Sequence, residues 1–168
     1  MAEQGITEAL DQNDPILRFV TCSERYLQWV NTKPDDVSEE VQIAYMFLLE
    51  INFNLFLLPA AQRTKDVQGV RPDNSYESFF QYRFQDFPVR YYAFSQNPFV
   101  NPPEESLIGD VAEDLTIIYL DLYEGLSLFH GKHISEAIWF WRESFIQSWG
   151  KNLVNALGAL YSYLALPE

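Results

Sequence analysis

Hydrophobic positions recur at helical spacing along most of the chain, and no stretch shows the strict alternation of a half-buried strand. The first helix is predicted to begin at Asp14, an N-cap residue, with Pro15 in the first helical position, and to end near Asn31. Its apolar stripe contains Leu17, Val20, Cys22, Leu27 and Val30, and Phe19 and Tyr26 lie alongside it. We therefore expect this helix to bury one side in a core.

A second helix is predicted to begin at Asp36, because Asp36 and Glu39 have the spacing of a capping box. Pro59 is expected to end or kink it. The apolar stripe of this helix contains Val41, Ala44, Tyr45, Leu48, Leu49, Asn52, Leu55 and Phe56.

A polar connection, residues 62–75, separates the second helix from an aromatic-rich insert, residues 76–99. Ten of the 24 residues in this insert are aromatic, far more than a short segment buries by itself. One short helix is predicted over residues 75–85 and another over residues 88–95, with Pro88 as a breaker.

Two long helices complete the prediction, over residues 103–129 and 135–164, and a bend is expected at Gly150. This order predicts an all-α protein, an antiparallel helical bundle of four main helices. The short aromatic-rich helices are inserted between the second and third main helices. The last helix is expected to be the central packing element, because its leucines form a continuous stripe.

Length and composition indicate a single domain over residues 1–168, with residues 1–13 flexible. Cys22 is the only cysteine and is expected to be a buried, small hydrophobic residue. A chain without a disulfide fits a reducing, cytoplasmic location. We find no signal-peptide pattern, and the apolar runs are too short and too polar for a membrane span, so no membrane association is expected.

The net charge of −13 disfavours binding to nucleic acid, whose phosphates would be repelled. Acidic residues are concentrated in residues 91–131, which contain seven carboxylates and no Lys or Arg. Basic residues cluster before and within the aromatic insert, at Arg63, Lys65, Arg71, Arg83 and Arg90.

One side of the predicted helix 103–129 is acidic, and it carries Asp110, Glu113, Asp114, Asp121 and Glu124. The other side is apolar, and it carries Val111, Leu115, Ile118, Leu122, Leu126 and Phe129. We favour a solvated acidic face. A basic protein partner docking there is a second interpretation. No Lys or Arg on the same helix neutralises these carboxylates, so Arg142, Lys151, the basic connection, a metal or a partner must do so.

The same carboxylates allow an alternative, a Mg²⁺- or Mn²⁺-dependent nucleotide hydrolase. Its candidate metal ligands are Asp110, Asp114, Asp121 and Glu124, and it would need a second acidic helix bearing Glu39, Glu40 and Glu50. His130 and His133 have no third ligand beside them in the sequence, so we expect no metal there and predict no cofactor.

The aromatic insert supplies further candidates for binding a partner or ligand, namely Tyr82, Arg83, Arg90 and Tyr91. Tyr and Arg are common at the energetic centres of protein interfaces. The simpler interpretation is that the rings cover the open end of the bundle and extend its core. A small-ligand pocket beneath the insert is a further alternative.

The last third of the chain contains the segments "DVAEDLTIIYLDLYEGLSLF" and "FWRESFIQSWGKNLVNALGALYSYL". They resemble the closing half of a bacterial family known only as domain of unknown function 5063, and the match covers about residues 105–165. The matching positions are Asp114, Leu115, Ile118, Tyr119, Asp121, Leu122, Trp149, Gly150, Leu153, Val154, Asn155, Ala156, Leu157, Ala159 and Leu160. The resemblance implies a soluble all-α bacterial protein without an assigned activity, and it suggests Asp114, Asp121 and Asn155 for testing.

Asn155 falls on the weakly polar back of the last helix, so we expect it to face solvent or to bond the backbone of a neighbouring helix. The leading functional hypothesis is a non-enzymatic interaction module, such as an adaptor, an immunity-type protein or a regulatory protein. It would present the acidic helix or the aromatic insert to another protein, either basic or apolar. The sequence leaves a homodimer open.

Overall fold

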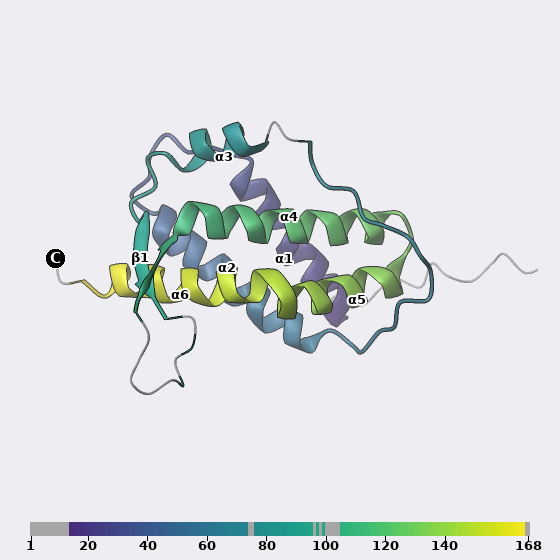
Figure 1. Ribbon diagram of the computed structural model, residues 1–168. Helices are drawn as coiled ribbons and strands as arrows, with labels where there is room; N and C mark the ends of the chain where they lie inside the picture. Colours follow the sequence, from purple (N-terminus) through teal and green to yellow (C-terminus); the bar gives the residue numbers. More distant parts are fainter. Residues whose placement is uncertain (1–13, 74–75, 96, 98, 100–104, 167–168) are drawn as a thin grey trace, which may run out of the picture.

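The computed structural model describes residues 14–73, 76–95, 97, 99 and 105–166, and it is mostly helical (Figure 1). Its elements follow in the order α1 (Pro15–Val30), α2 (Glu40–Leu57), α3 (Tyr76–Phe84), β1 (Tyr91–Phe94), β2 (Leu107–Asp110), α4 (Val111–His130), α5 (Ile134–Ser144), the π-helical turn η1 (Phe145–Trp149) and α6 (Gly150–Leu164). The predictions for residues 1–13 and for a helix start at residues 101–103 lie outside the described residues.

The first helix has the predicted start and end. The Asp14 carboxylate accepts a hydrogen bond from the backbone N–H of Ile16 at 2.8 Å, and Pro15 occupies the first helical position. Cys22 is 1% exposed, and its Sγ donates to the carbonyl oxygen of Phe19. Burial raises the pKa of the Cys22 thiol to about 12. The prediction of a buried, small hydrophobic residue is confirmed.

The second helix begins at Glu40, so the capping box predicted at Asp36 is wrong. The Asp36 carboxylate instead accepts a hydrogen bond from the backbone N–H of Ser38, a local turn that competes with helix initiation. Leu49 and Phe56, expected in the core, are 44% and 68% exposed. The buried side of α2 holds Val41, Ala44, Leu48, Ile51 and Leu55.

Helix α4 is the central packing element of the fold. It packs against α1, α3, α5 and α6, and Figure 1 shows it beside α6 with α1 and α2 behind. Its predicted apolar residues Val111, Leu115, Ile118, Leu122 and Leu126 are buried. The predicted last helix shares this role, because α5 and α6 pack against α4 and α6 also packs against α2, although its predicted stripe residue Leu164 is exposed.

Helix α4 approaches α5 closely at Gly125. A Cβ atom at this position would lie 1.9 Å from Nε1 of Trp141, so only a glycine permits the approach. The Trp141 ring is fully buried between the two helices and lies edge-on to Phe19 of α1. Gly125 therefore sets the distance between α4 and α5 on the inner side of the fold.

The small antiparallel sheet of β1 and β2 replaces two predicted helical segments. Tyr91 pairs with Asp110 and Phe94 with Leu107, so the predicted helix 88–95 and the all-α class are wrong in this region. Strand β1 is a run of aromatic residues, which favours strand conformation once a partner strand is available. A Cβ at Gly109 would lie 2.2 Å from the Tyr92 ring, so Gly109 makes room for that ring across the pair.

The predicted long last helix is observed as α5, η1 and α6, which follow one another without a break. The middle part, η1, is a π-helical turn. The turn spans Phe145–Trp149 and ends at Gly150, where a bend was expected. A Cβ at Gly150 would lie 2.4 Å from the carbonyl oxygen of Phe145. Glycine therefore accommodates the wider turn, which shifts the facing residues of α6 relative to α5.

Candidate functional site

The acidic side of α4 lies along the contact with α6 and the loop before α3. We call Asp110, Asp114, Asp121 and Glu124, together with the side chains that bond them, the polar seam. Each of these four carboxylates has at least one hydrogen-bond or ion-pair partner from outside α4. The question for function is how much of this acidic surface stays available.

Asp110 is the N-cap of α4 rather than a residue of its helical face. Its Oδ1 accepts from the backbone N–H of Ala112 at 2.9 Å, and its Oδ2 accepts from Nε of Arg90 at 2.9 Å. Arg90 also lies over the ring of Tyr91, with 5.6 Å between guanidinium and centroid. Asp110 and Arg90 thus fix the start of α4 to the segment of the aromatic insert just before β1.

Asp114 is buried where α4, α6 and β1 meet. Its carboxylate accepts from the Tyr92 hydroxyl at 2.5 Å and from Nδ2 of Asn152 at 2.7 Å. Burial raises the pKa of the Asp114 carboxyl to about 6, although both hydrogen bonds favour the ionised form. The Asn155 side chain lines a groove together with Tyr92 and partly offsets the raised pKa of the Tyr92 hydroxyl, so it lies beside the insert.

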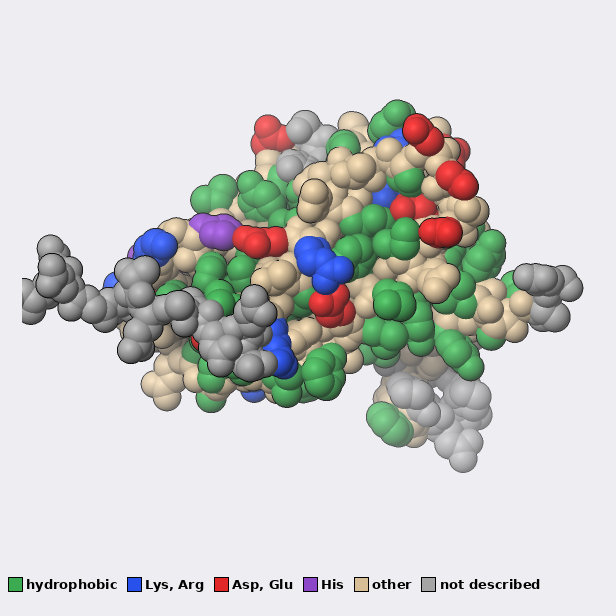
Figure 2. All heavy atoms as spheres, turned by 180° about the vertical axis from the view of Figure 1, so that it is seen from behind, with side chains coloured by type: hydrophobic (Ala, Val, Ile, Leu, Met, Phe, Trp, Pro, Cys, Tyr) green, Lys and Arg blue, Asp and Glu red, His purple; other side chains and the backbone are tan. Residues whose placement is uncertain are grey.

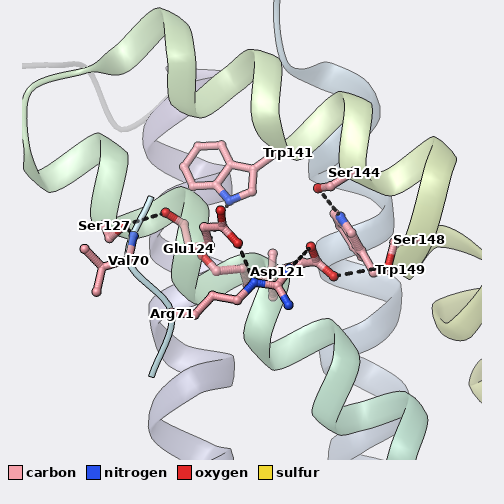
Figure 3. A network of polar contacts seen from close by, with 10 residues as sticks. Val70, Arg71, Asp121, Glu124, Ser127, Trp141, Ser144, Ser148 and Trp149 are labelled. Atoms are coloured by element: carbon pink, nitrogen blue, oxygen red, sulfur yellow. Dashed lines mark hydrogen bonds and ion pairs between the residues drawn. The ribbon is translucent and has the colours of Figure 1, made fainter. Parts of the chain in front are cut away.

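Asp121 and Glu124 share one cation, Arg71 (Figure 3). Nη2 of Arg71 lies 3.1 Å from Oδ1 of Asp121, and Nε lies 2.5 Å from Oε2 of Glu124. Burial raises the pKa of the Asp121 carboxyl to about 6, and the Arg71 charge opposes this rise. Ser148 of η1 donates to the second Asp121 oxygen at 3.4 Å.

Arg71 belongs to an irregular segment, residues 62–73, that we call the strap. In Figure 1 it leaves the end of α2, passes the end of α5 and crosses α4 on its way to α3. The backbone N–H of Val70 donates to the Ser127 hydroxyl at 2.7 Å, and a Cβ at Gly69 would lie 2.4 Å from Cγ of Glu124. The strap is therefore held against the outer side of α4.

The strap is also attached to α5. The Glu136 carboxylate accepts from the Thr64 hydroxyl at 2.6 Å and from the backbone N–H of Lys65 at 3.1 Å. The Thr64 hydrogen bond lowers the pKa of the Glu136 carboxyl. Among the sources expected to neutralise the acidic helix, the basic connection is observed to do so, through Arg71. Arg142 and Lys151 have other partners, because Arg142 donates to the carbonyl of Leu58 and Lys151 lies over the Phe94 ring.

The expectation of a solvated acidic face holds for Glu113, which is exposed in the first turn of α4. It is wrong for Asp114 and Asp121, which are 5% and 3% exposed. Asn152 was not among the candidates, although its position one turn after Ser148 places both on the side of α6 and η1 that faces α4. That spacing is the one signal in the sequence that could have identified it.

The described residues hold no group of three or more His, Cys, Asp and Glu side chains placed to bind a metal ion. The second acidic helix required by the hydrolase alternative does not face α4. Glu50 pairs with Arg25 at 3.1 Å, and Glu40 pairs with Arg83. His130 lies 3.1 Å from Glu24.

Arg83 is part of a buried ion pair and is not a surface residue, which corrects its prediction as a binding residue. Its Nη2 lies 2.7 Å from Oε2 of Glu40, and the two side chains are 1% and 3% exposed. Nε of Arg83 donates to the carbonyl of Val30, and the Trp29 indole N–H donates to Glu40. The pair therefore ties α3 to α1 and α2.

The rest of the aromatic insert divides between core and surface. Phe80, Phe84 and Phe87 are buried, as expected for rings that extend the core, whereas Tyr82 and Tyr91 are 58% and 68% exposed. A groove of about 590 Å³ lies between β1 and the second half of α6. Its lining includes Tyr91, Tyr92, Phe94, Asn155 and Tyr163.

The chain matches the model of a family described as a domain of unknown function, DUF5063, over residues 11–165. It therefore belongs to this family, and the resemblance seen over residues 105–165 extends to nearly the whole chain. The crystal structure of protein BF1032 from Bacteroides fragilis is similar, with 18% sequence identity and a TM-score of 0.73. The match covers 93% of this chain and 96% of that one, and at this identity it shows a shared fold. No curated protein matches the chain.

Proposed function

We propose that this chain is a non-enzymatic interaction module that binds another protein through the outer side of α2 and the adjoining side of η1 and α6. The scaffold in this proposal is an antiparallel bundle of four main helices, α1, α2, α4 and the continuous α5–α6. The polar seam then has a structural role. A cytoplasmic location and the absence of nucleic-acid binding remain predictions from charge and cysteine content.

The exposure of large apolar side chains on α2 carries this proposal. Met46, Leu49, Phe53 and Phe56 are 61%, 44%, 63% and 68% exposed. They continue onto the neighbouring helix, where Ile146, Val154 and Tyr161 are also exposed. We call these seven residues the apolar face. A helix that is apolar all round is normally covered on both sides.

Two ring contacts support the continuity of the apolar face. Tyr45 and Tyr161 lie 6.5 Å apart at one end of α2, and Phe56 and Phe145 lie 5.7 Å apart at the other. Helix α2 therefore runs antiparallel to η1 and α6 along its length. Figure 2, which views the side on which α1 and α2 lie, shows groups of hydrophobic side chains on both sides of a central pair of charged side chains.

The area of the apolar face also favours a binding role. Large side chains carry about 150–250 Å² each when fully exposed. The seven residues of the apolar face are 44–80% exposed, so together they present on the order of 800 Å². The largest apolar patch of an ordinary monomer is about 300–600 Å². The acidic residues offer less, because Asp110, Asp121 and Glu124 are paired with arginines from within the chain.

Among the described helices, α2 is also the one long and apolar enough to cross a membrane, and 39% of that stretch is buried inside the fold. Core helices of soluble proteins pass the same test. We propose a protein surface as the occupant of the outer side of α2, because its inner side already packs against α1 and α6.

The test is affinity capture from a lysate of the host. Three immobilised proteins are compared, namely the full wild-type chain, Phe53→Glu and Ile108→Glu. Ile108 is 72% exposed on β2, so it is a matched control away from the apolar face. A partner retained by wild type and Ile108→Glu but lost by Phe53→Glu supports the proposal. A partner retained equally by all three contradicts it.

The groove between β1 and α6 favours a second candidate function, the binding of a small amphipathic ligand. Aromatic rings of β1 form one wall, and the side chains of Asn155 and Ser162 supply polar groups. Native mass spectrometry of the purified chain tests this candidate. A co-purified small molecule that is present in wild type and lost in Asn155→Leu supports this candidate. If the measured masses of wild type and of Asn155→Leu both equal that of the chain alone, the candidate is contradicted.

A further inference from the structure

We infer that the occupant of the apolar face is a second copy of this chain, with the two α2 helices packed antiparallel about a two-fold axis. This inference rests on the proposed function, since it names the partner of the same surface. Four observations support it, namely residue spacing, area, the absence of charge and the distribution of charge at the two ends.

The exposed residues of α2 have the spacing of a helix-pairing surface. Gln42, Met46, Leu49, Phe53 and Phe56 follow one another at intervals of four, three, four and three residues. This alternation places all five on one narrow stripe, as at the a and d positions of a coiled coil. The stripe fits the corresponding stripe of another α-helix better than a flat or irregular surface.

The area is sufficient for a stable dimer. A specific interface buries about 800 Å² on each partner, and the apolar face presents an area of this order. In a two-fold dimer the same surface is used by both chains, so no second apolar surface is required. A self-complementary stripe meets this condition without any other change to the molecule.

The middle of this face carries no free charge, so two chains with a net charge of −13 can approach there. The charged residue nearest to the stripe in the middle of α2 is Glu50. Its two carboxylate oxygens accept from Nη1 of Arg25 at 3.1 and 3.2 Å. The acidic residues of α4 lie on the side of the fold that faces the strap and β1. Repulsion between two copies is therefore weakest at the apolar face.

Charge at the ends of α2 determines the direction of pairing. Asp36 and Glu39 precede the helix, whereas Arg142 is exposed at the other end, where Nη1 donates to the carbonyl of Leu58 at 2.9 Å. Antiparallel packing brings Asp36 and Glu39 near the partner's Arg142. Parallel packing would place the acidic ends together, and it would also align the helix dipoles unfavourably.

The antiparallel arrangement fixes which residues meet across the axis. The centre of the four apolar residues of the stripe, Met46 to Phe56, falls between Leu49 and Phe53, so Leu49 faces the partner's Phe53. By the same symmetry Met46 faces the partner's Phe56. A parallel arrangement would instead bring each residue opposite its own copy.

Sedimentation equilibrium of the full chain between about 1 and 200 µM tests the dimer. We expect wild type and Ile108→Glu to reach twice the chain mass of 19.6 kDa, and Phe53→Glu to weaken association at least 100-fold. Far-ultraviolet circular dichroism checks that Phe53→Glu stays folded, and Met46→Glu is a second disrupting variant. A wild type that stays monomeric throughout overturns the inference, but the proposed function stands if capture still depends on Phe53.

Disulfide cross-linking tests the direction. Mixing Met46→Cys with Phe56→Cys should give a cross-linked dimer rapidly, and each variant alone should give it at least ten times more slowly. Cys22 remains in both variants because its thiol is buried. Rapid cross-linking of each variant with itself would show parallel pairing and overturn the antiparallel arrangement.

Discussion

The amide nitrogen of Asn152 lies 2.7 Å from the carboxylate of Asp114, and this contact joins α6 to the first turn of α4 in a buried position. The Tyr92 hydroxyl completes the arrangement by donating to the other carboxylate oxygen. A residue expected on a solvated surface is thus a contact between three elements. Several properties of the protein depend on such buried polar contacts.

Asp114→Asn should reduce the dependence of stability on pH. The folded pKa of about 6 exceeds the ordinary 3.8, so the stabilising contribution is fully present below about pH 4 and is lost as pH rises through 6. Wild type should gain about 1 kcal/mol from this group on going from pH 7.5 to pH 5.0. In Asp114→Asn that part of the gain should disappear, as measured by urea unfolding at both pH values.

The matched control is Glu113→Gln, which removes an exposed carboxylate from the same turn. Its charge contributes less than burial to the raised pKa of Asp114, so most of the pH dependence should remain in this variant. Carboxyls with lowered pKa values, those of Asp36, Asp86 and Glu136, lose their contribution only at lower pH and do not interfere. An unaltered difference between pH 5.0 and 7.5 in Asp114→Asn would show that this carboxyl titrates normally.

Arg71→Gln should destabilise the protein by about 1–2 kcal/mol at pH 7.5, less than the loss of a fully buried pair because the Arg71 side chain is 51% exposed. The Asp121 carboxylate would then be buried without its cation. At pH 5.0 Asp121 is largely protonated, so the loss should be smaller. Lys65→Gln removes the same charge from the strap and should cost less than 0.5 kcal/mol. Equal losses at both pH values would contradict this account of Arg71.

Arg83→Met should cost about 3–5 kcal/mol, because it leaves the Glu40 carboxylate buried and unpaired. Combining it with Glu40→Gln should recover part of the loss, which denaturant unfolding of the double-mutant cycle would measure. Arg25→Met breaks the exposed pair with Glu50 and should cost no more than about 1 kcal/mol. Similar losses for the two arginines would show that burial of the α3 pair contributes little.

Gly125→Ala and Gly158→Ala make the same change in two helices and should have opposite effects. The added methyl at position 125 would collide with Trp141, so a loss of about 2–3 kcal/mol is expected. No atom lies within 4 Å of a Cβ at position 158, where alanine should stabilise α6 by about 0.5–1 kcal/mol. Thermal melting distinguishes these outcomes, and a tolerated Gly125→Ala would contradict the close packing of α4 on α5.

Local signals in the sequence were sufficient where a helix depends on its own residues. Asp14 and Pro15 predicted the start of α1, and the spacing on α4 placed its apolar residues correctly in the core. The strands were missed because β1 and β2 are each four residues long, and each gains its hydrogen bonds from the other.

The candidate site was predicted in part for a related reason. Helical spacing indicated that Asp114 and Asp121 share a side of α4, but it carries no information on which distant segments cover that side. Tyr92, Asn152 and Arg71 do so, and they come from three separate parts of the chain. On α2 the assumption of one buried stripe assigned Leu49 and Phe56 to the core, whereas the helix is apolar on both sides.

The central claim is that association uses the apolar face of α2 and leaves the acidic residues in a structural role. Its most direct test is the dissociation constant of the wild-type chain, measured by sedimentation velocity at 50 and 500 mM NaCl. We predict that the dissociation constant stays the same or falls at 500 mM NaCl. Salt does not screen apolar contact, but it does screen the repulsion between two acidic chains. A dissociation constant that rises more than tenfold at 500 mM would show that charge carries the association and would contradict the claim.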